Sequence, residues 1–368
     1  MKKRPINLTE EEHMAKIAVV GAGAIGSLIG VYLTKAGADV WLVDPWREHM
    51  EAMQTRGLLL EEPDGVSTIK VKAIHISEIR RLGKADTVLL SVKSQYTMAT
   101  LTVVKPLLVK DGCVVSCQNG INEDVISSIV GPSATLGCVI HLGATLIGPG
   151  HVKRLRRGGC LVIGEYIGGV TERLKALATL LSVCAETRVT EDLRGERWTK
   201  LAENSAGNPL LALTGYTTQE LDGNRAATPV RRALVRELIL VAEACGVRVK
   251  PILGIQPAVW KAPLSVGLAE IERGFSERAK VMVSARSSMS YDMEQGRPME
   301  IDALNGYIVA KGRDVGIETP VNAVVVSMIR DMENGLLKPD PKNLSALAVA
   351  VNTSVSGCKV SGSQTMSG

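Results

Sequence analysis

The chain has 368 residues, of which 45% are hydrophobic and 22% are charged. This length is sufficient for two domains, and a formal net charge of +5 is too small for it to indicate a nucleic-acid partner. Seven dispersed cysteines without a CxxC pair predict reduced thiols, a cytoplasmic location and no metal site. The sequence has no apolar run long enough for a membrane helix and no secretory signal, so no membrane contact is expected.

The first half of the chain alternates short strands with helical segments. Strands are expected at 16–20, 39–43, 69–73, 87–92, 114–117 and 135–140. The first strand leads into a glycine-rich segment at 21–26 and an apolar helix, and the second strand ends at Asp44. This order predicts an α/β domain with a doubly wound, Rossmann-type sheet over residues 14–190, after an N-terminal extension at 1–13.

The hydrophobic pattern becomes helical after about residue 190. Helices are expected at 192–213, 228–246, 266–295 and 300–315. Glycines lie where three of these helices would end, at Gly246, Gly296 and Gly316. The pattern therefore predicts an all-helical C-terminal domain over residues 191–337, followed by a tail at 338–368 that is poorly ordered at its end.

The glycine-rich segment predicts a dinucleotide site. Gly21 permits a tight turn, Gly23 lets the backbone approach a pyrophosphate, and Gly26 lets the helix pack on the strand. The alternative is a glycine-rich turn in an unrelated α/β protein. The predicted cofactor-binding loop consists of Gly21, Ala22, Gly23, Ala24, Ile25 and Gly26.

Asp44 bears on the choice of cofactor. A carboxylate at the end of the second strand accepts hydrogen bonds from the adenosine ribose and repels a 2′-phosphate, which favours NAD(H). Arg47 could instead bind that phosphate. Both NAD(H) and NADP(H) therefore stay open.

Polar residues follow two later strands of the predicted sheet. Lys93 follows the strand at 87–92, and Asn119 follows the strand at 114–117. Ligands of open α/β sheets bind outside the carboxyl ends of strands, so both residues are candidates for contact with the nicotinamide half or the substrate. The alternatives are an exposed lysine and an Asn-Gly turn.

The expected helix at 192–213 carries a polar residue at every fourth position, namely Lys200, Asn204 and Asn208. Residues four apart share one face of a helix, so these three predict a polar ridge on an otherwise apolar segment. A solvated helix face is the alternative. Two later residues are also candidates: Ser288, which could be a solvated helix hydroxyl, and Glu300, which could be only a first-turn acid.

Together these segments resemble the ketopantoate reductase (2-dehydropantoate 2-reductase) family over about residues 14–335. The matching segments are GAGAIG at 21–26, Lys93, QNG at 118–120, WTKLAENSAGNPL at 198–210 and SSMSYDMEQGRPMEID at 287–302. The resemblance implies an NADPH-dependent reductase and a homodimer. It also implies that Lys200 is the general acid, that Glu300 holds it, and that Lys93 lies near the cofactor. The residues implied to grip the substrate are Asn119, Asn204, Asn208 and Ser288.

Three positions depart from the family pattern. Ala285 and Thr218 stand where the family usually has asparagine, and Asp44 stands where it usually has a basic residue. A retained lysine with lost amides suggests a retained reaction and a changed substrate.

Three functions follow from these residues. The leading hypothesis is NAD(P)H-dependent reduction of a 2-oxo acid or related ketone, with ketopantoate as the default substrate. The second is NAD-dependent oxidation of a secondary alcohol or hydroxy acid in a catabolic route. The third is a dinucleotide-sensing regulator without catalysis.

Overall fold

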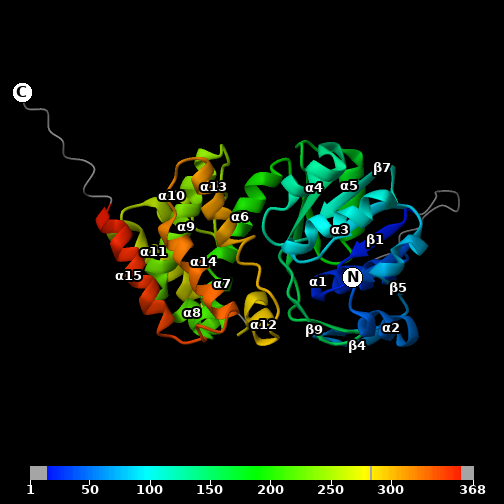
Figure 1. Cartoon of the computed structure of the whole chain (residues 1–368), viewed down its shortest axis with the longest axis horizontal. Helices are drawn as coiled ribbons and strands as arrows, with labels where there is room; N and C mark the ends of the chain where they lie inside the picture. The colour runs from blue at the N-terminus through cyan, green and yellow to red at the C-terminus, as the bar shows by residue number, and fades with distance from the viewer. Residues whose placement is uncertain (1–14, 282–283, 358–368) are drawn as a thin grey trace, which may run out of the picture. The chain divides into compact units, whose positions relative to one another are not determined.

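The chain divides into two units, residues 1–194 and 195–368, in a computed structural model that describes residues 15–281 and 284–357 (Figure 1). The expected N-terminal extension and the end of the expected tail lie outside the described residues. Each unit is built around its own buried apolar residues.

The first unit contains an eight-stranded sheet in the order β12-β11-β8-β7-β6-β1-β2-β5. The strands are β1 (Ile17–Val20), β2 (Val40–Asp44), β5 (Lys72–His75), β6 (Ala85–Leu90), β7 (Leu108–Ser116), β8 (Thr135–Ile140), β11 (Cys160–Glu165) and β12 (Glu186–Val189). The pairs from β5 to β8 are parallel, and β11 runs antiparallel to β8. The strand order reverses at β1, which lies between β2 and β6, so a ligand crevice is expected at the carboxyl ends of these strands.

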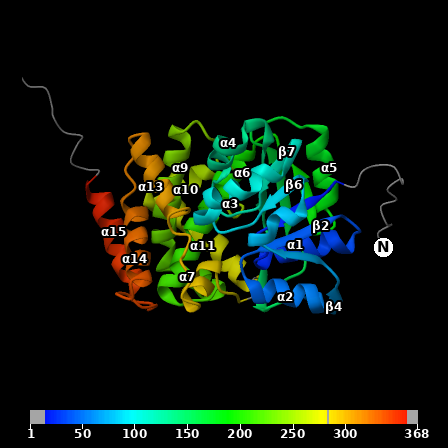
Figure 2. The ribbon, with the colours of Figure 1, turned by 45° about the vertical axis from the view of Figure 1, so that its right-hand side comes forward.

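Helices cover both faces of this sheet, which confirms the doubly wound prediction. Ile17 and Val19 of β1 pack with α1 (Ala24–Lys35), α2 (Arg47–Arg56) and α5 (Glu172–Leu181). Ala18 and Val20 pack on the other side with α3 (Thr97–Val104), α4 (Glu123–Val130) and the 3-10 helix η1 (Ile76–Leu82). Figures 1 and 2 both show α3 and α4 side by side. Because both faces are covered, the strands need continuous apolar runs instead of alternation.

A second sheet of four strands was not predicted. It has the order β4-β3-β10-β9, formed by β3 (Leu58–Glu62), β4 (Gly65–Ile69), β9 (Ala144–Gly148) and β10 (His151–Arg154). The strand expected at 69–73 is instead divided between β4 and β5. The parallel pairing of β10 with β3 joins segments about 90 residues apart, for which a local pattern gives no signal.

The second unit is helical, as predicted. Its helices are α6 (Leu193–Ser205), which begins in the first unit, α7 (Asn208–Thr214), α8 (Thr218–Gly223), α9 (Ala227–Ala244), α10 (Pro257–Lys261), α11 (Leu264–Val281), α12 (Ser288–Glu294), α13 (Asn305–Asp314), α14 (Pro320–Glu333) and α15 (Asn343–Gly357). The buried helix α9 packs against α10, α11, α13, α14 and α15. Over the described part of the chain, no helix is both long and apolar enough to cross a membrane.

Two of the expected helices are interrupted. The helix expected at 192–213 is divided into α6 and α7, because Pro209 lacks the amide hydrogen that a continuous helix requires and instead occupies the first turn of α7. The helix expected at 266–295 is divided into α11 and α12, and Ser287 caps α12 by accepting a hydrogen bond from the Ser290 amide at 3.1 Å.

The observed C-terminal ends of three helices agree with the ends predicted from the sequence. Gly246, Gly296 and Gly316 have φ values of 71°, 61° and 71°, which confirms that these positions terminate helices. The helix expected at 300–315 starts at Asn305, after a turn. Helix α15 lies within the expected tail.

Candidate active site

The glycine loop joins β1 to α1. Gly21 has φ +96°, and a Cβ there would lie 2.5 Å from the Val92 nitrogen. A Cβ on Gly26 would lie 2.0 Å from the Gly21 carbonyl oxygen. By contrast, a Cβ on Gly23 would meet nothing within 4 Å, and no side chain caps α1 at this residue. The fold therefore requires glycine at 21 and 26, whereas Gly23 leaves open space at a helix N-terminus that fits the pyrophosphate of a dinucleotide.

Asp44 lies beside this loop at the end of β2, since the Gly21 amide donates to the Val43 carbonyl at 2.8 Å. The carboxylate is half-buried, and its Oδ1 accepts a hydrogen bond from the Trp46 amide at 2.9 Å. Burial raises the pKa of Asp44, while hydrogen bonds from the Trp46 and Ala22 amides act in the opposite direction. A ribose diol that donates to this carboxylate would compensate part of its desolvation.

His49 of α2 is a member of the same site that sequence reasoning missed. Its side chain is fully buried, and its Nδ1 accepts a hydrogen bond from the Gly150 amide at 2.8 Å. Nε2 must then carry the proton, which it can donate to the Ala22 carbonyl at 3.0 Å. Burial lowers the pKa of His49. A neutral imidazole thus connects the glycine loop to the turn between β9 and β10.

Lys93 and Asn119 follow the parallel neighbours β6 and β7, as expected from the sequence. The strands are in register through the pair Leu90 and Ser116, so both residues lie at the carboxyl edge of the sheet. Lys93 precedes a 3-10 turn that begins at Ser94, and both Lys93 and Asn119 are half-buried. This edge of the first unit carries an ammonium and a carboxamide next to the strand-order reversal.

Hydrogen bonds between the two strand-end loops fix these residues. Buried Gln118 donates from Nε2 to the Val92 carbonyl at 2.9 Å and to the Thr97 hydroxyl at 2.7 Å. Buried Asn122 donates from Nδ2 to the Asn119 carbonyl at 2.8 Å and to the Ser94 hydroxyl at 3.2 Å. Sequence reasoning did not assign a role to Asn122, because its partners lie on both loops.

The polar ridge predicted on one helix is not continuous. Lys200 and Asn204 lie on α6, whereas Asn208 is the first residue of α7, so the prediction of one helix face through all three was wrong. The Lys200 side chain is 19% exposed, and its Nζ lies 3.4 Å from the Glu203 carboxylate. A lysine with a mostly buried side chain and an adjacent carboxylate therefore lies one turn before Asn204, which is itself buried.

Asn208 and Ser288 are brought together at the starts of two helices. The Ser287 hydroxyl donates to the Asn208 backbone carbonyl at 3.2 Å and caps α12. Ser288 is the next residue, and its side chain is exposed. Two residues that are 80 positions apart in the sequence thus lie at one place in the second unit.

The two departures from the family pattern are also neighbours. The Thr218 amide donates to the Ala285 carbonyl at 2.8 Å, and the Ala285 amide donates to the Thr218 hydroxyl at 3.2 Å. Ala285 lies only three residues before Ser288. Both substitutions therefore change the same small part of the second unit.

Glu300 is buried, with 8% of its surface exposed. It precedes the turn that leads into α13, and its carbonyl accepts a hydrogen bond from the Leu304 amide at 3.2 Å. It is therefore not in the first turn of a helix, which removes the simplest alternative explanation for this acid. The partnership of Glu300 with Lys200 stays a prediction.

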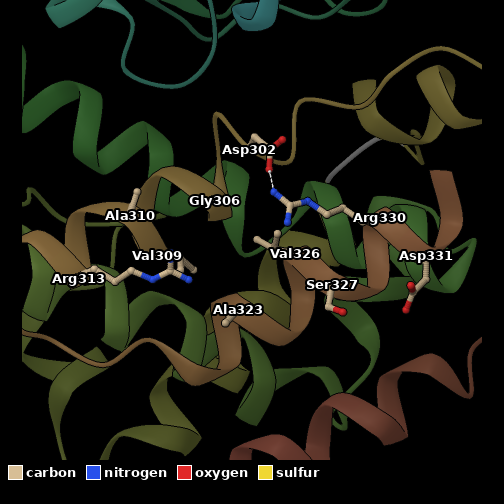
Figure 3. A pocket seen from close by; sticks show the side chains of 10 residues that line it. All are labelled: Asp302, Gly306, Val309, Ala310, Arg313, Ala323, Val326, Ser327, Arg330 and Asp331. Carbon is tan, nitrogen blue, oxygen red and sulfur yellow. Dashed lines mark hydrogen bonds and ion pairs between the residues drawn. The ribbon is translucent and has the colours of Figure 1, made fainter. Parts of the chain in front are cut away.

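A separate pocket of about 610 Å³ lies between α13 and α14 (Figure 3). Arg313 and Arg330 extend into it from the two helices. The Arg330 guanidinium donates a hydrogen bond to the Asp302 carboxylate at 2.7 Å. Its lining residues are Asp302, Gly306, Val309, Ala310, Arg313, Ala323, Val326, Ser327, Arg330 and Asp331. None of the sequence-predicted site residues lines this pocket.

The first unit has the glycine loop and strand-end acid of a dinucleotide-binding domain, and the helical unit carries a largely buried lysine with carboxamides. These features define an NAD(P)-linked oxidoreductase that acts on CH–OH groups. Two family profiles match the chain: "Ketopantoate reductase PanE/ApbA" over residues 17–168 and "Ketopantoate reductase PanE/ApbA C terminal" over residues 192–333. The chain belongs to the ketopantoate reductase family.

Individual relatives agree with this membership. A 2-dehydropantoate 2-reductase of Mesorhizobium japonicum is 30% identical over 337 residues, which cover 86% of this chain and 97% of the relative. The crystal structure of a PanE/ApbA family ketopantoate reductase from Ralstonia eutropha is 31% identical, covers 87% of this chain and 99% of its own, and has a TM-score of 0.74. D-mandelate dehydrogenase, solved with NADH and anilino(oxo)acetate, shares the fold at 24% identity over 88% of this chain and 100% of its own, with a TM-score of 0.76.

Proposed function

We propose that this chain reduces a 2-oxo acid or a related ketone to the hydroxy compound with NAD(P)H, with ketopantoate as the default substrate. The observation that carries the proposal is Lys200, a lysine on α6 with a mostly buried side chain and a carboxylate 3.4 Å from its Nζ, in a chain of the ketopantoate reductase family. The relatives named for 2-dehydropantoate reduction support this direction over oxidation of a hydroxy acid.

In this mechanism, Lys200 is the general acid. Negative charge develops on the carbonyl oxygen of the substrate as the ketone is reduced, and the Nζ ammonium stabilises that charge and donates its proton. The Glu203 carboxylate, 3.4 Å from Nζ, is proposed to orient the ammonium, and Glu300 is proposed to hold it as well. Asn204, Asn208 and Ser288 are proposed to orient the substrate, because amides and a hydroxyl bind a carboxylate without donating the reacting proton.

The first unit is proposed to hold the cofactor. The glycine loop binds the pyrophosphate at the N-terminus of α1, and Lys93 and Asn119 contact the nicotinamide half. When bound, the reduced nicotinamide supplies the hydride. Asp44 lies where a ribose diol would donate to its carboxylate, and that carboxylate repels a 2′-phosphate. We therefore infer a preference for NAD(H) over NADP(H).

The adjacent Thr218 and Ala285 bear on which 2-oxo acids besides the default ketopantoate this chain accepts. Neither offers the carboxamide that the family pattern places there, so a polar group on the far end of the substrate would lose hydrogen-bond partners. A 2-oxo acid with an apolar side chain fits the methyl groups of these two residues better. The oxidation of a secondary alcohol on the same machinery remains a second candidate because Asp44 favours NAD⁺.

Lys200→Ala tests the mechanism. The measurement is the initial rate of NADH and NADPH oxidation with a panel of 2-oxo acids and ketones, beside calorimetric binding of the cofactor. We expect a loss of kcat of about 100-fold or more with unchanged cofactor affinity. Lys261→Gln, at a lysine paired with Glu243 elsewhere in the helical unit, serves as the control and should retain full activity.

Three outcomes would contradict parts of this proposal. Near-full turnover of Lys200→Ala on every substrate that the wild type accepts would remove the lysine from the mechanism. A strong preference for NADPH would overturn the inferred cofactor preference. Tight cofactor binding without turnover across the whole panel would favour the dinucleotide-sensing regulator.

We further propose that the chain functions in the cytoplasm as a homodimer. Cys113, Cys138, Cys184 and Cys245 carry free thiols, as expected for a reducing compartment. A ketopantoate reductase from Staphylococcus aureus, which shares the fold at 18% identity, is dimeric. Sedimentation equilibrium of the full chain measures its mass in solution, and a monomer would contradict the proposed assembly.

A further inference from the structure

Trp46 places a large exposed aromatic ring beside the glycine loop. It follows Asp44 by two residues, at the end of β2, and it is the residue that precedes α2. Trp46 is 38% exposed, which places it among the exposed large hydrophobic residues of the structure. Its amide donates to the Asp44 carboxylate at 2.9 Å, so the backbone of the two residues is fixed as one turn.

The indole is held on one side by His49. The two rings stack with centroids 5.1 Å apart and planes 17° apart. His49 is fully buried and hydrogen-bonded through its two ring nitrogens to the Ala22 carbonyl and the Gly150 amide. The orientation of the Trp46 ring is therefore set by a chain of contacts that begins in the glycine loop itself.

One part of the dinucleotide requires a surface of this kind. If Asp44 binds the adenosine ribose, the adenine is attached to that ribose and extends past the end of β2. Adenine is a flat, neutral π system, and an aromatic side chain held parallel to it offers stacking energy at little entropic cost because the ring is already ordered. Asp44 supplies the polar contact with the ribose, and Trp46 supplies the apolar surface beside it.

We propose that the exposed face of Trp46 is the stacking surface for the adenine ring of the cofactor, and that His49 is the positioning residue that holds the indole in place. This inference rests on the dinucleotide binding proposed above. It assigns the adenine half of the cofactor to Trp46, Asp44 and the glycine loop, and leaves the nicotinamide half to the loops after β6 and β7.

Fragments of the cofactor test this assignment on the full chain. Calorimetry measures the Kd values of ADP-ribose and nicotinamide mononucleotide for the wild type, Trp46→Ala and Trp46→Phe. We expect Trp46→Ala to weaken ADP-ribose binding roughly 10-fold, with the binding of nicotinamide mononucleotide unchanged. Trp46→Phe should retain most of the affinity, because it keeps an aromatic face. Ile167→Ala, at an exposed apolar side chain of the same unit, should bind both fragments as the wild type does.

Fluorescence provides a second readout that a loss of folding would not imitate. ADP-ribose does not accept energy from indole, so quenching of tryptophan emission on its addition reports direct stacking. The quenching should occur in the wild type and vanish in Trp46→Phe, which retains the other tryptophans. His49→Gln, which loses the ring that supports the indole, should reduce both the quenching and the ADP-ribose affinity and leave the binding of nicotinamide mononucleotide unchanged.

The outcomes separate this inference from the proposed function. If the wild type binds neither ADP-ribose nor NADH, the dinucleotide function itself is wrong. If the wild type binds ADP-ribose and Trp46→Ala binds it equally well, the function stands and the stacking assignment is overturned. Equal losses of ADP-ribose and nicotinamide mononucleotide binding in Trp46→Ala would also overturn it, because they would indicate damage to the whole unit.

Discussion

Replacing Gly23 with alanine should separate folding from cofactor binding. A Cβ at this position would meet nothing within 4 Å, and its φ of −65° and ψ of −164° are accessible to alanine. The small cost of losing glycine at a helix N-cap is offset by the smaller entropy of the unfolded chain. We therefore expect the free energy of unfolding to change by no more than about 0.5 kcal/mol, which corresponds to a Tm shift within about 2 °C.

Cofactor binding should respond far more strongly to the same change. The new methyl group occupies the open space that fits the pyrophosphate, and it keeps the phosphates away from the backbone amides at the start of α1. Loss of one hydrogen bond to a charged group costs about 1.5–3 kcal/mol. The Kd of NADH should consequently rise roughly 10- to 100-fold in Gly23→Ala.

Calorimetric titration with NADH and thermal unfolding of the ligand-free protein measure the two effects. Gly26→Ala is the contrast, because its Cβ would lie 2.0 Å from a backbone oxygen and should lower the Tm markedly. Gly223→Ala also points into open space but lies on α8, so it should leave the Kd of NADH unchanged and the Tm equal to or slightly above that of the wild type. Wild-type affinity for NADH in Gly23→Ala, or a fall in Tm equal to that of Gly26→Ala, would refute the reasoning.

The remaining predictions concern cofactor choice, pH and a buried ion pair. Asp44→Arg should shift the ratio of NADH to NADPH affinity by at least about tenfold toward NADPH, and an unchanged ratio would contradict the role of the carboxylate. Burial lowers the pKa of His49, so the imidazole stays neutral in the folded state while the unfolded chain takes up a proton below about pH 6.5. The wild type should therefore lose more stability than His49→Gln between about pH 7.5 and 5.5 in urea titrations, and equal losses would exclude this contribution. The Arg231 guanidinium lies 2.6 Å from the Asp222 carboxylate, and Asp222→Ala would leave this buried charge without that partner. The free energy of unfolding should fall by about 3–5 kcal/mol in chemical denaturation. Glu277→Ala, at an exposed ion pair, should have no measurable effect.

The sequence predicts those parts of the fold whose signal is local. The first strand, the glycine loop and the acid at the end of β2 form a continuous segment, and each residue type has a steric or electrostatic reason to be there. The second sheet has no such signal, since β3 pairs with β10, a strand about 90 residues away in the sequence. The break between α6 and α7 did leave a signal in Gly207 and Pro209, but the apolar period on both sides obscured it.

The candidate site likewise contains residues with a local sequence signal and residues without one. The sequence singles out four candidates whose residue types and positions have a chemical reason, namely Lys200, Asn204, Asn119 and Asp44. The sequence did not reveal a role for His49, because this role depends on a hydrogen bond from the amide of Gly150, 101 residues away. Partners at such separations are set by the folded chain as a whole, so a single sequence without homologues does not reveal them.

The break between α6 and α7 has a consequence for how enzymes of this kind diverge. Lys200 belongs to one rigid segment, whereas Asn208 belongs to the next and is tied through Ser287 to the start of α12. A mutation in the link at 206–207 or in the segment at 284–287 can therefore move Asn208 and Ser288 as a pair while Lys200, the proposed proton donor, stays in place. Natural selection, or a protein engineer, can explore new substrates at this joint without rebuilding the chemistry.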